Sequence, residues 1–168
     1  MALSMLVRYR DWKCKIILVV DANSPETIFY SIDNHWSKPH VVVRSASKKE
    51  IGNTTFHCMR GRVDVIIQDK AIQVKWKAVF SSSYICALPS LQGRTVTFKV
   101  SAGQTKGFKL SCLDDKAMPV ARSSGASFAD SMNSIGKLEI AEEYAGRQDV
   151  RDEIVVIALS LTHPNLTG

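Results

Sequence analysis

The side chains that could carry out acid–base or nucleophilic chemistry in this sequence are four histidines and a run of three serines. They are His35, His40, His57 and His163, with Ser81, Ser82 and Ser83. Catalysis of this kind needs a base held within reach of the reacting group, and the sequence contains neither a G-x-S-x-G nor an H-E-x-x-H motif. We expect His40, which follows Pro39 where a strand begins, and His57, which lies between Phe56 and Cys58, to be structural. The residue types predict no catalytic residue.

The cysteines also give no site. Cys14, Cys58, Cys86 and Cys112 are widely spaced and form no C-x-x-C pair, so we expect no metal and no cofactor. The N-terminus carries basic residues ahead of a short apolar run but lacks the small-residue cleavage site of a secretory signal. The sequence therefore predicts a cytoplasmic protein with reduced thiols and no signal peptide, able to associate with a membrane at its periphery.

Basic residues give the strongest binding signal. The net charge of +6 arises in residues 1–84, which carry 13 basic and 7 acidic groups, whereas residues 85–168 carry 9 of each. Lys75 and Lys77 alternate with apolar residues on a predicted strand, and Arg60 and Arg62 lie in the hairpin before it. These four residues are the candidate lipid-binding site, because cations that converge on one face attract anionic phospholipid. The alternative is a solvated strand face with lysines that protect its edge.

The aromatic residues favour packing over binding of nucleic acid. We expect Trp12, Trp36 and Trp76 to pack in the fold. A base-stacking platform needs aromatic residues at alternate positions of adjacent strands with basic residues between them. Only Phe98 with Lys99 comes near this pattern, so a nucleic-acid partner is not expected.

Most of the chain shows the period-two alternation of half-buried strands. The clearest segments are 72–76, 96–100 and 108–112, and further strands are predicted at 16–20, 27–32, 40–45, 54–58, 62–67, 118–122 and 135–141. About ten short strands separated by turn residues indicate a barrel or a sandwich in one domain. The longest apolar run, 154–159, is far shorter than the roughly 20 residues of a transmembrane helix.

The C-terminal segment is apolar on every face. Asp149 is a suitable N-cap for a helix that starts at Val150, but the β-branched run Ile154–Ile157 favours a strand, so the two signals disagree. A segment apolar all round is buried in either case. A terminal apolar helix preceded by amphipathic strands would thread a barrel formed by those strands.

Several short motifs occur together in a characteristic order over residues 14–163. They are Lys38-Pro39-His40 before VVVRSAS, the segment 50–57 (EIGNTTFH), the strand 61–66 (GRVDVI), TFK at 97–99 followed by GFKL at 107–110, and the closing 152–159 (DEIVVIAL). With these motifs the chain resembles the tubby C-terminal-like superfamily, which includes tubby domains, LURP-one-related proteins and phospholipid scramblases. The resemblance is strongest to small fungal tubby-like proteins.

The resemblance implies one domain over residues 1–168, mainly β. Its fold would be a closed, roughly 12-stranded antiparallel β-barrel around a C-terminal hydrophobic helix at about 150–162, which decides between helix and strand. Tubby domains bind phosphoinositides through basic residues on the barrel exterior. The function implied here is a non-catalytic module that recognises anionic lipid headgroups or a protein partner through the barrel surface. The contacts expected from the charge pattern, rather than from the resemblance, are Arg60, Arg62, Lys75 and Lys77.

Two other functions remain open on the sequence alone. One is a secreted or translocated effector-like interaction protein without membrane affinity, which would be found in culture supernatant. The other is a small isomerase or cyclase that works in a cleft near His35, His40 or His57. A helix that fills the barrel would count against the enzyme, because it leaves little interior space for a substrate.

Overall fold

The computed structural model describes residues 2–11, 16–57, 61–78, 82–101, 109–126 and 133–167, with side chains in the last range as far as Thr162. The described strands are β1 (Leu3–Tyr9), β2 (Ile16–Asp21), β3 (Ile28–Asn34), β4 (Val41–Ser45), β5 (Glu50–His57), β6 (Arg62–Ile67), β7 (Lys70–Trp76), β8 (Ser83–Leu88), β9 (Arg94–Val100), β10 (Leu110–Leu113), β11 (Pro119–Gly125) and β12 (Ser134–Ile140). Two 3-10 turns, η2 (Pro89–Leu91) and η3 (Glu142–Tyr144), precede the helix α1 (Gln148–Thr167).

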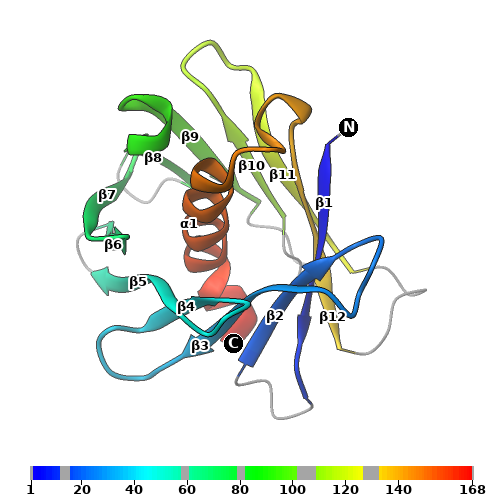
Figure 1. Ribbon diagram of the computed structural model, residues 1–168. Coiled ribbons are helices and arrows are strands. Elements are labelled where there is room, and N and C mark those ends of the chain that lie inside the picture. Colours follow the sequence, from blue (N-terminus) through cyan, green and yellow to red (C-terminus); the bar gives the residue numbers. More distant parts are fainter. Residues whose placement is uncertain are drawn as a thin grey trace.

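The strands form a closed antiparallel barrel in which each one pairs with its neighbours in sequence (Figure 1). Pairing of β1 with β12 completes the barrel, for example at Met5 and Leu138. Every described strand therefore has a partner on both sides, although β7 and β8 pair only briefly, at Lys75 with Ile85 and at Trp76 with Tyr84. The predicted fold class, a 12-stranded antiparallel barrel with a C-terminal helix, is confirmed.

Alternation along each strand separates the interior from the outer wall. Val63, Val65 and Ile67 of β6 are buried, while Arg62 and Ile66 face outward. Two of the strands were not predicted from the sequence: β1 (LSMLVRY) and β8 (SYICAL). Both carry apolar residues on their outward faces as well, such as Leu6 and Ile85, so the period of two is lost.

Helix α1 runs through the centre of the barrel, and all its described residues from Asp152 to Thr162 are buried. It includes the predicted range 150–162 and begins two residues earlier. The β-branched residues Ile154–Ile157 are helical here because the surrounding wall buries every face of the segment, which outweighs a weak intrinsic preference. Asp149 is not the N-cap; it lies in the first turn, where its Oδ1 accepts from the Val150 N–H at 2.9 Å.

Strand β5 packs closely against the helix at Gly52. A Cβ on Gly52 would lie 3.2 Å from Val156 Cγ2 and 2.9 Å from the Ile66 carbonyl oxygen, so the site requires glycine. Further along β5, the buried hydroxyls of Thr54 and Ser160 lie 2.7 Å apart. These contacts fix the depth at which α1 sits in the barrel.

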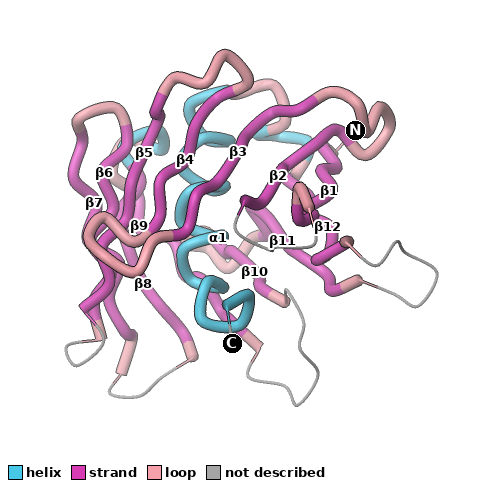
Figure 2. Tube along the Cα trace, turned by 90° about the horizontal axis from the view of Figure 1, so that it is seen from below, coloured by secondary structure: helices cyan, strands magenta, loops and turns pink. Residues whose placement is uncertain are grey.

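The up-and-down topology gives the barrel two distinct ends. The connection from β12 and the turns β2–β3, β4–β5, β6–β7, β8–β9 and β10–β11 lie where α1 begins. The loop between β3 and β4 lies at the other end, together with the C-terminus of α1 (Figure 2). The two ends of each strand, although close in sequence, therefore lie at opposite ends of the barrel.

Candidate functional site

The structure brings together three of the four predicted site residues. Arg62 on β6 pairs directly with Lys75 on β7, so both side chains lie on the same outward face. Lys77 follows two residues later on that face and, like Lys75, is exposed. The fourth residue, Arg60, lies outside the described residues.

Arg62 is not a free cation. Its Nε lies 3.1 Å from Asp64 Oδ1, and His57 Nε2 lies 2.7 Å from Asp64 Oδ2. The three side chains come from adjacent positions of β5 and β6 on the same outward face. Asp64 therefore offsets part of the positive charge that the sequence pattern assigned to Arg62, and Lys75 and Lys77 remain as the available cations of the predicted site.

Strand register extends this basic surface beyond the predicted residues. The Lys77 N–H donates to the Ser83 carbonyl oxygen at 2.8 Å, and Ser83 pairs with Lys99. Lys99 in turn pairs with Ser111, which pairs with Arg122. Since strands lie about 4.8 Å apart, successive cations of this row are roughly 10 Å apart, with a serine between each pair.

A second row continues the alternation nearer the end of the barrel where α1 finishes. The Ser101 N–H donates to the Lys109 carbonyl oxygen at 3.0 Å, and Ser124 pairs with Lys137 on the neighbouring strands. We call the two rows the cation–serine surface; its members are Lys77, Ser83, Lys99, Ser101, Lys109, Ser111, Arg122, Ser124 and Lys137. A shallow depression of about 530 Å³ lies in it, lined among others by Lys99, Lys109 and Arg122.

The cations of this surface differ in how far they are neutralised. Arg122 Nε lies 2.8 Å from Glu139 Oε2. Within the described ranges, no carboxylate lies within 4.0 Å of Lys75, Lys77, Lys99 or Lys109. Lys99 and Lys109 were missed in the sequence because they alternate with apolar residues like any solvent-facing lysine; only the register places them beside Lys77.

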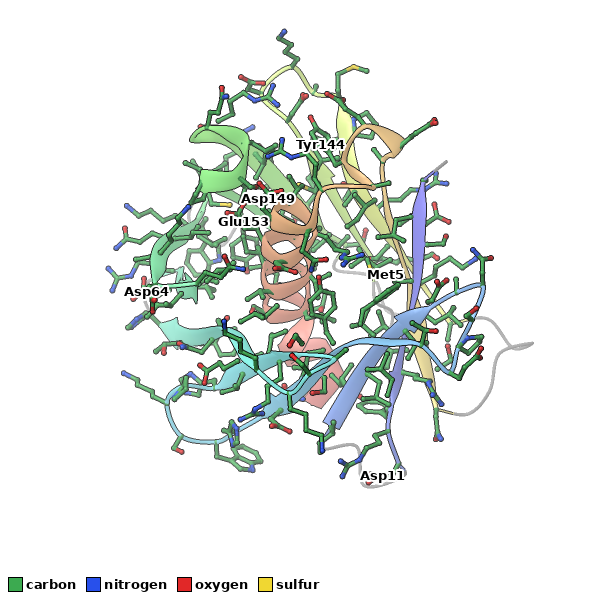
Figure 3. All side chains as sticks on the ribbon, viewed as in Figure 1. Met5, Asp11, Asp64, Tyr144, Asp149 and Glu153 are labelled. Atoms are coloured by element: carbon green, nitrogen blue, oxygen red, sulfur yellow. The ribbon has the colours of Figure 1, made fainter. Side chains whose placement is uncertain are left out.

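Charge is divided between the two ends of the barrel rather than between the two halves of the sequence. Around the end where α1 finishes, the described basic residues are Arg8, Arg10, Lys38, Arg62, Lys75, Lys77, Lys99 and Lys109, against Asp11, Asp33 and Asp64; Arg44, Arg122, Lys137 and Glu139 lie on the strands between the two ends and are counted at neither. Around the end where α1 begins, the acidic residues are Asp21, Glu26, Glu50, Asp69, Asp114, Asp115, Glu142, Glu143, Asp149, Asp152 and Glu153, against Lys48, Lys49, Lys70, Arg94, Lys116, Arg147 and Arg151. We refer to these as the basic end and the acidic end; Figure 3 shows Asp149 and Glu153 at the start of α1, far from Asp11.

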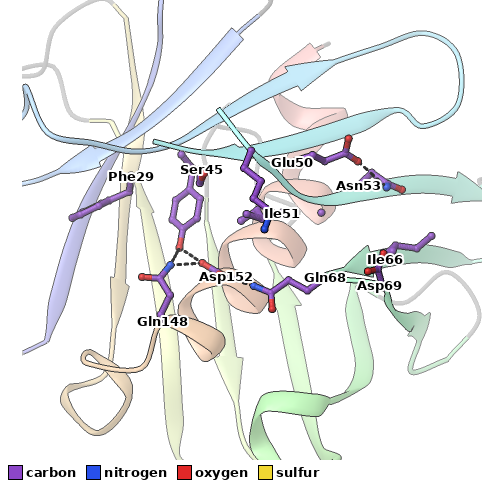
Figure 4. A pocket seen from close by; sticks show the side chains of 13 residues that line it. Phe29, Ser45, Glu50, Ile51, Asn53, Ile66, Gln68, Asp69, Gln148 and Asp152 are labelled. Carbon is purple, nitrogen blue, oxygen red and sulfur yellow. Dashed lines mark hydrogen bonds between the residues drawn. The ribbon is translucent and has the colours of Figure 1, made fainter. Parts of the chain in front are cut away.

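The acidic end contains a larger cavity, of about 640 Å³, lined by residues that include Tyr30, Gln68, Gln148 and Asp152. Asp152 is buried, and its Oδ1 accepts from the Tyr30 hydroxyl at 2.5 Å and from Gln148 Nε2 at 2.6 Å. Gln68 Nε2 donates to Oδ2 at 3.3 Å (Figure 4). Burial and the neighbouring Asp152 raise the pKa of Tyr30. These bonds tie α1 to β3 and to the β6–β7 turn, which explains the cluster as an anchor for the helix.

The adjacent carboxylate, Glu153, anchors the helix to another part of the wall. Its oxygens accept from the Ser90 backbone N–H, at 3.1 Å to Oε1, and from the Ser90 hydroxyl. Burial raises the pKa of Glu153, and the bonds from Ser90 oppose that shift. Both buried carboxylates of α1 thus have donors from the surrounding strands and turns, as buried charges require.

Of the histidines, His40 makes a structural contact. His35 is exposed, and His40 Nδ1 accepts from the Phe56 N–H at 3.1 Å. Burial, together with the positive charges of Lys38 and His57, lowers the pKa of His40, in keeping with its role as acceptor. Neither the depression in the cation–serine surface nor the cavity at the acidic end is lined by His35, His40 or His57. The side chain of His163 lies outside the described residues.

The described part of the chain contains no grouped metal ligands. Among its residues, no three His, Cys, Asp or Glu side chains lie together so that they could hold a metal ion. None of the helices in these ranges has the length and apolar character that a bilayer span requires. Cys86 and Cys112 are free and buried, whereas Cys14 and Cys58 lie outside the described residues.

Comparison with known proteins supports the fold. The sequence matches no protein-family model, and no curated protein shows significant similarity to it. An X-ray structure of a protein from Arabidopsis thaliana is similar to this chain with a TM-score of 0.60 and 12% sequence identity, over 95% of this chain and 91% of that one. At this identity the likeness shows the fold alone. That fold fits the barrel that the tubby-like resemblance implies.

Proposed function

We propose that this chain is a tubby-like, non-catalytic module that binds anionic phospholipid headgroups, phosphoinositides in particular, through its basic end and the cation–serine surface. The observation that carries the proposal is the group of exposed lysines without a carboxylate partner among the described residues: Lys75, Lys77, Lys99 and Lys109. They lie on or beside β7, β9 and β10 in one wall of the barrel, so a membrane surface can meet all of them at once.

The chemistry of this surface suits phosphate. Ammonium groups and serine hydroxyls both donate hydrogen bonds, and phosphate oxygens accept them. Rows of cations roughly 10 Å apart suit an extended array of headgroups better than one small ligand. Helix α1 fills the barrel interior, so in the described part of the chain the outer wall offers the broad binding surface.

The opposite charges of the two ends would orient the molecule on a membrane. An anionic bilayer attracts the basic end and repels the acidic end, over a distance of about 10 Å at 0.1 M salt. The protein would therefore associate with the membrane peripherally, with the start of α1 pointing into solution. This arrangement also explains how a modest net charge of +6 can produce directed binding.

Vesicle co-sedimentation with neutral, phosphatidylserine and phosphoinositide liposomes tests the proposal at low and physiological salt. Each cation near an anionic surface contributes about 1 kcal/mol, so K75E/K77E is expected to weaken binding at least about 30-fold. The matched control is K48E/K49E, which makes the same charge change in the β4–β5 turn at the acidic end and is expected to bind nearly as wild type does.

A second double variant, K99E/K109E, tests the two lysines that only the structure added to the predicted site. It is expected to weaken vesicle binding to a similar degree, because both lysines lie on the same wall as Lys77. Equal binding by wild type and both variants would refute the site. If wild type binds none of the vesicles, lipid recognition is refuted and the hypothesis of a protein partner remains.

A further inference from the structure

Trp36 has the most exposed side chain among the large apolar residues described, with a relative exposure of 102%. The sequence suggested that it packs in the fold, and that prediction is wrong. Indole has a large apolar body with one N–H donor, so full exposure to water is costly unless the residue has a partner. The other exposed large apolar residues, Ile28, Ile66 and Met118, are between 40% and 60% exposed.

The loop that carries Trp36 is firmly held at its base. The His35 N–H donates to the His40 carbonyl oxygen at 2.7 Å, and the His40 N–H donates to Thr54 on β5 at 2.8 Å. The His40 ring also accepts from the Phe56 N–H and lies 5.4 Å from the Phe56 ring. Because the base of the loop is already fixed, binding through Trp36 does not require the whole loop to lose conformational entropy.

This loop lies at the basic end of the barrel. It joins β3 to β4 at the end where α1 finishes, as Figure 2 shows. Lys38 is exposed in the same loop. Next to it, His57 on β5 pairs with Arg62, which pairs with Lys75, so Lys75 lies only two strand spacings, roughly 10 Å, from β5.

We infer that Trp36 is an interfacial anchor that inserts into the boundary between headgroups and acyl chains when the basic end meets an anionic membrane. This inference rests on the proposed function and names the membrane itself, rather than a free headgroup, as the partner. Tryptophan is enriched at this depth of a bilayer because its ring is amphipathic. Apolar insertion and attraction of nearby lysines to anionic lipid add to one another in peripheral binding.

Substitution of Trp36 tests the inference on the full chain. W36A is expected to weaken partition into phosphatidylserine and phosphoinositide vesicles about tenfold, since roughly half of the indole surface leaves water on insertion. Its thermal stability should match that of wild type, because an exposed side chain contributes little to packing. The control M118A removes another exposed apolar residue, in the β10–β11 turn at the acidic end, and should bind as wild type does.

Fluorescence locates the indole directly. Wild-type emission minus that of W36F isolates Trp36 from Trp12 and Trp76, and vesicles should shift this difference to the blue and allow quenching by brominated lipid. Binding of soluble inositol hexakisphosphate should be unchanged in W36A, because that ligand has no acyl chains. If wild type binds vesicles and W36A binds them equally, without quenching, the anchor is refuted while the proposed function stands. If wild type binds no vesicle at all, both are refuted.

Discussion

The Tyr30–Asp152 hydrogen bond allows a quantitative test of how α1 is held in the barrel. Asp152 is 3% exposed, and its carboxylate accepts from Tyr30, Gln148 and Gln68 at 2.5, 2.6 and 3.3 Å. A hydrogen bond to a charged group contributes about 1.5–3 kcal/mol. Y30F removes the shortest of the three donors, so we expect it to lower the free energy of unfolding by about 2 kcal/mol.

A matched tyrosine provides the control. Tyr144 is also buried, but its hydroxyl accepts only a long bond from Arg94 Nη2, at 3.4 Å. Y144F is therefore expected to cost less than about 1 kcal/mol. In a double-mutant cycle, Y30F and D152N should show a coupling energy of about 1–2 kcal/mol, because Y30F removes the donor of this bond and D152N removes the charge of its acceptor.

Urea unfolding followed by circular dichroism measures these differences as shifts of the midpoint at a constant slope. The pH dependence adds a second check. Because the pKa of Tyr30 is raised in the folded state, the stability it confers is present below about pH 10 and is lost as pH rises above that value. Above this pH, the difference in the free energy of unfolding between wild type and Y30F should therefore decrease. Equal costs for Y30F and Y144F, or additivity within about 0.5 kcal/mol in the cycle, would refute the reasoning.

Two further predictions concern single sites. In the same urea assay, G61A should lower the free energy of unfolding by more than about 2 kcal/mol, because Gly61 has φ +58° and a Cβ there would lie 2.0 Å from the Trp76 ring. The control G93A should lower it by only about 1–2 kcal/mol, because Gly93 has φ +75° but a Cβ there would meet nothing within 4 Å. In C14S/C58S, Cys86 and Cys112 should resist thiol reagents at pH 8 and react only in urea, since burial raises the pKa of Cys86 to about 12 and also raises that of Cys112. The stability linked to these raised pKa values is lost as pH rises above about 8.5, and rapid native labelling would contradict their burial.

Much of the architecture was accessible from the sequence. Alternation at segments such as 72–76 and 96–100 is a local property, since successive residues of a strand point to opposite faces whatever the strand pairs with. It correctly placed Lys75 and Lys77 outside and Ile72 and Val74 inside. The uniform apolarity of 154–159 likewise required burial on all sides, although the choice of a helix there depended on the family resemblance.

The candidate site was only partly accessible. Lys99 and Lys109 join Lys77 because of strand register, which no local pattern encodes. The ion pair between Arg62 and Asp64 follows from their local spacing on one strand face, but the contact of Asp64 with His57 depends on the register of β5 and β6. The prediction that Trp36 packs in the fold rests on residue type alone, and the exposure of this side chain depends on the conformation of the loop between β3 and β4.

The sequence by itself determined which residues face inward and outward along most strands and that the C-terminal segment is buried, because side-chain direction and apolarity are local. Tertiary structure alone decided the distribution of charge. An antiparallel barrel reverses direction at every hairpin, so the charges of one hairpin are divided between two ends of the molecule. The basic excess that the sequence located in residues 1–84 is therefore a basic end, to which Lys99 and Lys109 of the second half also contribute.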